Sequence, residues 1–92
     1  MPLVDAPPEG CFWVHNGPIV KNLKELLASL KKMKKDTFRH HVNKEKNDFS
    51  KWIQDVLGHK KLAEDLKKIR SKKSLMEKIE REIRRMEKAV KL

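Results

Sequence analysis

NDFSKWIQDVLG, residues 47–58, holds the signals of one complete short helix. Asn47 or Asp48 can accept hydrogen bonds from the free backbone amides of the first turn, and Gly58 suits the helix end because glycine tolerates positive φ. Between these ends, apolar side chains recur at intervals of three and four residues, so they form a single face. The predicted buried face comprises Phe49, Trp52, Ile53, Val56 and Leu57.

Two helices are predicted upstream of this stretch. The clearer one starts at Ile19 and keeps an apolar stripe as far as Met33. Lysines follow at its carboxyl end, where positive charge suits the helix dipole. Asp36 can cap a shorter helix that contains Phe38 and Val42.

Two helices are also predicted downstream. The first begins near Lys60 and carries Leu62 and Leu66, and RSKKS (70–74) then interrupts the apolar pattern. Ser74 with Glu77 forms a capping box that can start the last helix, although continuity through the interruption stays open. The apolar positions of this last helix are spaced as in a coiled-coil seam, which needs a surface on its own domain or on a second copy. They are Met76, Ile79, Ile83, Met86 and Val90.

The amino-terminal residues have no helical period. Residues 1–10 hold three of the four prolines and predict an extended tail. CFWVH (11–15) is aromatic and β-prone, and the turn signal NGP follows it. A lone strand has no partner within the chain. Unless it adds to another chain, we expect an extended arm that places Phe12, Trp13 or Val14 against the helices.

These elements together predict an all-α protein. It is expected to be a small helical bundle with an extended aromatic N-terminal arm and a long basic amphipathic C-terminal helix. The expected division is a tail at residues 1–10, a helical domain at 11–70 and a basic C-terminal extension at 71–92. The predicted core consists of Leu23, Leu26, Leu30, Phe38, Phe49, Trp52, Ile53, Val56, Leu62 and Leu66.

The composition indicates a small basic protein of the cytoplasm. In 92 residues, 38% are hydrophobic and 39% charged, so the core is small. A single cysteine cannot form an internal disulfide, no apolar run has the length of a membrane span, and the first residues lack the pattern of a secretory signal. The abundance of lysine and glutamate is typical of heat-adapted organisms.

The net charge of +10 favours a polyanionic partner. Residues 1–58 hold ten basic and seven acidic residues, and residues 59–92 hold thirteen and six, so the carboxyl-terminal part carries +7 of the total. KKMKK (31–35) and KKIRSKK (67–73) are the densest clusters, and Arg81, Arg84 and Arg85 form a further strip opposite the seam. The charged tip KEK (44–46) between two helices is a loop that can touch a partner.

Histidine and cysteine do not form a recognisable chemical site. Cys11, His15, His40, His41 and His59 lack the paired spacing of structural zinc sites, and nothing activates a nucleophile. We expect a half-buried His41 and a solvated His40, with no metal, no cofactor, no small-molecule substrate and no catalysis.

FWVHNGPIVKNLKELLASL, DTFRHHVN, NDFSKWIQDVLG and KLAEDL, in this order, resemble an uncharacterised domain family of archaea and bacteria. The pattern F-x-x-H-V-N followed by N-D-F-x-x-W-I-x-D-V-x-G is its most specific part. The resemblance covers about residues 10–66 and implies a compact helical fold. The family has no assigned activity, so the resemblance implies no catalytic residues. Residues 67–92 lie outside the resemblance and look like an addition.

The predicted function is non-catalytic binding to RNA or a ribonucleoprotein, in the manner of a ribosome-associated accessory or hibernation-type factor. Phosphate contacts give such binding affinity with little sequence preference, and RNA is favoured over DNA by a small margin. A membrane is a weaker partner because the last helix lacks Trp and Phe. The alternative is a module that homodimerises through the C-terminal seam. The candidate phosphate-binding residues are Lys31, Lys32, Lys34, Lys35, Lys67, Lys68, Arg70, Lys72, Lys73, Arg81, Arg84 and Arg85.

Overall fold

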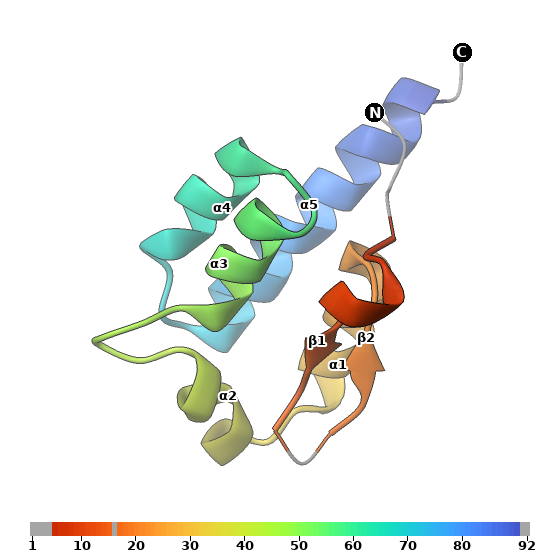
Figure 1. Cartoon of the computed structure of the whole chain (residues 1–92). Coiled ribbons are helices and arrows are strands. Elements are labelled where there is room, and N and C mark those ends of the chain that lie inside the picture. Colours follow the sequence, from red (N-terminus) through yellow and green to blue (C-terminus); the bar gives the residue numbers. More distant parts are fainter. Residues whose placement is uncertain (1–4, 16, 91–92) are drawn as a thin grey trace.

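The computed structural model describes residues 5–15 and 17–90, which form a mostly helical protein with a small antiparallel hairpin (Figure 1). Helix α5 runs the length of the molecule, and the hairpin lies in front of α1. The elements are a single 3-10 turn η1 (Pro8–Gly10), strands β1 (Phe12–Trp13) and β2 (Ile19–Val20), and helices α1 (Leu23–Lys32), α2 (Lys35–His41), α3 (Asp48–Asp55), α4 (Lys60–Lys67) and α5 (Lys72–Val90).

The hairpin corrects the all-α prediction. Phe12 pairs with Val20 and Trp13 with Ile19, and the predicted turn closes with a hydrogen bond of 3.1 Å from the Val14 amide to the Pro18 carbonyl. The aromatic strand therefore has a partner within the chain. The apolar spacing had assigned that partner, Ile19–Val20, to the first helix.

The real start of α1 is set by its cap. The Asn22 side chain accepts a hydrogen bond of 2.8 Å from the Glu25 amide, and the Glu25 carboxylate accepts one of 2.9 Å from the Lys21 amide. This arrangement is a variant of the capping box, because Glu25 reaches the amide of the residue before the cap, and it satisfies free amide groups at the start of the helix. The helix consequently begins at Leu23, after the strand.

The caps of the other helices agree in part with the prediction. Asn47, rather than Asp48, caps α3 by accepting from the Ser50 amide at 3.0 Å, and Gly58 follows α3 with φ of 70° as expected. Asp36 does not cap α2, because it lies within the first turn of this helix, and Lys34 occupies the cap position without a side-chain hydrogen bond.

The connection between α4 and α5 is a break in the helical path. Helix α4 ends at Lys67 and α5 begins at Lys72, so the two helices are not continuous. The Ser74 capping box is not formed at the start of α5. Instead, the Ser71 hydroxyl accepts a hydrogen bond of 3.4 Å from the Ser74 amide. The residue that caps α5 is therefore Ser71, three residues before the predicted cap, Ser74.

Helices α1 and α5 pack antiparallel, and polar contacts hold both ends of the pair. At one end Lys24 Nζ lies 2.6 Å from a carboxylate oxygen of Glu87, and at the other Lys72 Nζ donates to the Met33 carbonyl at 2.7 Å. Helices α3 and α4 also pack antiparallel, with the Ser50 hydroxyl 2.5 Å from the Ala63 carbonyl. Neighbouring helices therefore alternate in direction around the core.

Helix α5 completes this core. The predicted core residues are buried, except that Val56 is partly exposed, and α5 adds side chains that the prediction assigned to an interaction seam or omitted. Ile79, Ile83 and Met86 are at most 6% exposed, and Leu75 is fully buried beside them. The surface that the seam needs is thus provided by its own domain. The side chain of Val90 lies outside the described residues.

In the part of the chain that the structure describes, no helix has the length and apolar character needed to cross a bilayer.

Candidate nucleic-acid interface

The alternating helix directions bring the main basic segments to one end of the molecule. The carboxyl ends of α1 and α4 and the amino end of α5 meet there, together with the loop that leads into α3 (Figure 1, lower part). We call this surface the basic end. It comprises Lys31, Lys32, Lys34, Lys35, Lys44, Lys46, Lys67, Lys68, Arg70, Lys72 and Lys73.

Lys72 joins the two basic clusters that are far apart in the sequence. Its ammonium group is partly buried and donates to the Met33 carbonyl, at the carboxyl end of α1. A cation at this position satisfies an otherwise free helix carbonyl and suits the negative end of the dipole. Lys72 therefore has a structural role, and it fixes residues 31–35 beside residues 67–73.

The loop at residues 42–47 forms the third part of the basic end. Asn47 caps α3 and also donates from Nδ2 to the Leu66 carbonyl at 2.9 Å, which holds the loop against the end of α4. A cleft of about 160 Å³ lies between them. Its charged lining residues are Lys44, Glu45, Lys46, Lys67 and Arg70.

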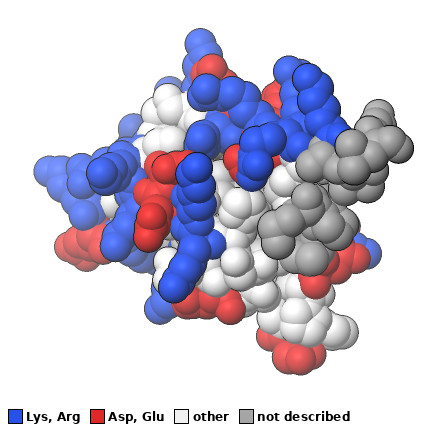
Figure 2. Space-filling view, turned by 90° about the horizontal axis from the view of Figure 1, so that it is seen from above, with Lys and Arg blue, Asp and Glu red and all other residues white. Residues whose placement is uncertain are grey.

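Most cations of the basic end are exposed. Within the described residues, no carboxylate forms an ion pair with Lys31, Lys32, Lys34, Lys35, Lys67, Lys68, Arg70 or Lys73. Lys46 is paired with Asp48 at 3.1 Å, and the acidic neighbours of the surface include Asp36 and, on one flank, Glu64 and Asp65. Figure 2 shows the upper end of the molecule, where Lys and Arg lie beside Asp and Glu.

The arginine strip on α5 is separate from the basic end. Arg84 lies twelve residues after the start of α5, or about 18 Å along the helix axis. It pairs with Glu80 at 2.7 Å, and Arg85 pairs with Glu82. The hydrogen bond from Arg85 lowers the pKa of Glu82, and the same contact raises the pKa of Arg85. Of the predicted strip, Arg81 alone has no such partner among the described residues.

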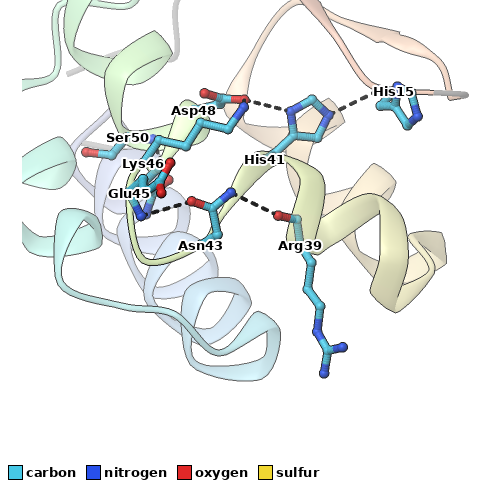
Figure 3. A network of polar contacts seen from close by, with 9 residues as sticks. His15, Arg39, His41, Asn43, Glu45, Lys46, Asp48 and Ser50 are labelled. Atoms are coloured by element: carbon cyan, nitrogen blue, oxygen red, sulfur yellow. Dashed lines mark hydrogen bonds and ion pairs between the residues drawn. The ribbon is translucent and has the colours of Figure 1, made fainter.

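A buried histidine connects the hairpin to α2 and α3 (Figure 3). The His15 backbone amide donates to His41 Nε2 at 3.0 Å, and His41 Nδ1 lies 3.0 Å from Asp48 Oδ2. Because an amide can only donate, Nε2 is the acceptor, so Nδ1 carries the hydrogen and donates to Asp48. Both ring nitrogens are therefore occupied, and neither is free to accept a proton from a substrate.

Two pKa shifts accompany this network. Partial burial opposes ionisation of Asp48, but hydrogen bonds from His41 and Lys46 outweigh it, so the pKa of Asp48 lies below its usual value. His40 is on the surface and stacks on His15 with ring centroids 4.1 Å apart. Desolvation and the neighbouring imidazoles lower the pKa of His40, which favours its neutral form in the folded protein.

Replacement of His41 by Phe is expected to lower the free energy of unfolding by about 1–3 kcal/mol. An aromatic ring is kept, but the His15 amide and the Asp48 carboxylate lose their partner. Urea denaturation monitored by circular dichroism measures the loss. The control is His40→Phe, the same change at the exposed neighbour, which should shift stability by less than about 0.5 kcal/mol. Equal losses in the two variants would contradict the role given to His41.

The described residues contain no group of three or more His, Cys, Asp or Glu side chains that could hold a metal ion. His59 caps α4 through Nδ1, which lies 3.4 Å from the Leu62 amide. Its Nε2 faces Glu82 at 3.4 Å. Cys11 donates its thiol hydrogen to the Pro7 carbonyl. These groups serve the local structure of the elements that carry them.

One family model matches residues 11–88, and its description is a family of unknown function, DUF5752. The chain belongs to this family. Because the match extends to residue 88 and so includes most of α5, the expectation that the chain from residue 67 onward is an addition to the family domain was wrong. The resemblance to an uncharacterised family is confirmed. No curated protein and no solved structure matches this DUF5752 chain.

Sequence reasoning omitted two lysines from the basic surface of the DUF5752 domain. Lys44 and Lys46 belong to the charged tip KEK, which was recognised as a possible contact but not joined to the other clusters. The position of this loop beside α4 depends on Asn47. Its capping role could be predicted from the sequence, but its second hydrogen bond, to the end of α4, could not.

Proposed function

We propose that this protein binds RNA, or a ribonucleoprotein, through the basic end and without catalysing a reaction. The observation that carries the proposal is the hydrogen bond from Lys72 to the Met33 carbonyl, which holds two lysine-rich segments side by side. Exposed and largely unpaired cations at this density neutralise phosphates and release counterions. Backbone contacts of this kind position a protein on RNA without reading its sequence.

The proposed setting is the cytoplasm, where structured RNA of the ribosome is an abundant ligand for a small basic protein. Shape and phosphate contacts govern recognition of such RNA, and neither needs a base-reading motif. An accessory or hibernation-type role at the ribosome is the form of the proposal that we favour. Homodimerisation through α5 has no supporting observation, because Ile79 and Ile83 are buried within their own chain.

A titration of a fluorescein-labelled RNA stem-loop across salt concentrations tests the proposal. The logarithm of the affinity should fall linearly with the logarithm of the salt concentration. Six phosphate contacts would lower the affinity on the order of 10³-fold between about 50 and 200 mM salt. Fluorescence anisotropy measures binding at each concentration. A flat response, or no binding at the lowest salt, would overturn the proposal.

A further inference from the structure

Trp13 is the most exposed large hydrophobic side chain of the described residues, at 73%, and its cross-strand partner Ile19 is 51% exposed. Residues paired across an antiparallel ladder point to the same face of the hairpin. Their neighbours Phe12 and Val20 form the inner face and are buried. The outer face of the hairpin therefore presents an indole ring to solvent, beside one aliphatic side chain.

The exposure of Trp13 contrasts with the burial of the second tryptophan. Trp52 is 7% exposed, and its Nε1 donates to the Gly10 carbonyl at 2.7 Å. Its ring also packs edge-on against Phe12, with centroids 5.7 Å apart. Trp52 is thus explained by the core, whereas the ring of Trp13 has no comparable role in the fold.

Two grooves beside the hairpin lie between Ile19 and lysines of the basic end. A groove of about 270 Å³ between β2 and α1 is lined by Ile19, Ala28 and Lys32. Lys32 also lines a second groove of about 450 Å³, beneath the hairpin turn, together with His15 and Lys34. Lys32 is therefore shared by the two grooves, which connect Ile19, the cross-strand partner of Trp13, to Lys32 and Lys34.

We propose that Trp13 is a stacking platform for an unpaired base of single-stranded RNA, whose phosphates follow Lys32 and Lys34 toward the basic end. This inference rests on the proposed function and adds the class of RNA to it. Aromatic side chains beside a basic groove are the usual elements of single-strand binding, because every base has a face that can stack. The bases of a duplex are already stacked on each other and cannot use the ring.

The size and charge of the surface favour RNA over a protein partner. A stable protein interface needs roughly 800 Å² on each side around an apolar centre. In the described part of the chain the exposed large hydrophobic residues are Trp13 and Ile19, which match the area of a nucleobase better than such a centre. The nearest carboxylate of the first groove, Glu25, accepts a hydrogen bond within the cap of α1, and Asp36 lies on the wall of the second.

The test compares three labelled probes of equal length: an oligouridylate, an abasic ribose-phosphate oligomer and an RNA duplex. The wild-type protein should bind the oligouridylate more tightly than the abasic oligomer and quench the fluorescence of Trp13. Trp13→Ala should weaken oligouridylate binding roughly five-fold or more and leave abasic binding unchanged. Trp13→Phe, which keeps a ring, should restore most of the difference. Because the side chain is mostly exposed, circular dichroism should show the same fold in both variants.

The outcomes separate this inference from the proposed function. Equal, salt-sensitive binding of the oligouridylate and the abasic oligomer would overturn the role of Trp13 and leave phosphate binding intact. An unchanged oligouridylate affinity in Trp13→Ala would also overturn it, and would assign the ring to another partner such as a protein. Salt-insensitive binding, or none to any probe, would remove both proposals.

Discussion

A chain that ends at Arg70 is expected to be unfolded under conditions in which the full chain is folded. Removal of α5 takes away Leu75, Ile79, Ile83 and Met86, all of which are buried. Each such side chain contributes about 1.5–3 kcal/mol, and the apolar face of α1 becomes exposed as well. The sum is comparable to the whole stability of a small domain, about 5–15 kcal/mol. Far-UV circular dichroism and a urea titration of the shortened chain measure the effect.

Single substitutions in the full chain provide the matched controls for this truncation. Ile79→Ala should cost about 2–5 kcal/mol, because Ile79 is fully buried. Met76→Ala, three residues earlier on the same helix, should cost less because Met76 is only partly buried. Cooperative unfolding of residues 1–70 alone would show instead that α5 is an independent extension, as the initial division at residue 71 supposed.

Charge reversal at the basic end is expected to lower RNA affinity roughly 100-fold or more at about 0.1 M salt. The variant combines Lys34→Glu, Lys67→Glu and Arg70→Glu. Lys34 follows α1, Lys67 ends α4, and Arg70 lies in the connection between α4 and α5. Each lost phosphate contact removes about 0.9 from the slope of log affinity against log salt. The slope should therefore fall by about three, as measured by anisotropy with the RNA stem-loop.

A second triple variant has the same net charge as the first but carries its three substitutions on a different surface. Lys60→Glu, Lys61→Glu and Lys88→Glu reverse three exposed lysines at the start of α4 and the end of α5, which lie at the opposite end of the molecule. If binding depends on the basic end, this control should lose affinity several times less than the first variant. Equal losses would mean that total charge, and not a particular surface, governs binding.

The helices were predictable because their signals are local. Asn47 and Gly58 bound α3 in the sequence as they do in the structure, and apolar spacing identified the buried faces of α1 and α4. The second strand was missed because Ile19 and Val20 continue the apolar spacing of α1. The correct reading was present in the capping box of Asn22 and Glu25, which requires the helix to start after residue 22.

The basic end could be predicted only as separate pieces. Nothing local in residues 31–35 or 67–73 indicates that they meet, because their proximity depends on the antiparallel packing of α1 and α5. The exposure of Trp13 could not be predicted either, because it also depends on contacts between distant parts of the chain. An aromatic strand has two faces, and which of Phe12 and Trp13 is buried follows from the pairing with β2 and from the position of α3 behind it.

The pairing of α1 with α5 also constrains how the protein is made. Leu26 and Leu30 of α1 are fully buried, yet much of what covers them belongs to α5, which is synthesised after the other described elements. While the chain is still growing, this apolar stripe has no complete cover and is open to chaperones or to neighbouring nascent chains. The native core therefore closes only after α5 has been synthesised.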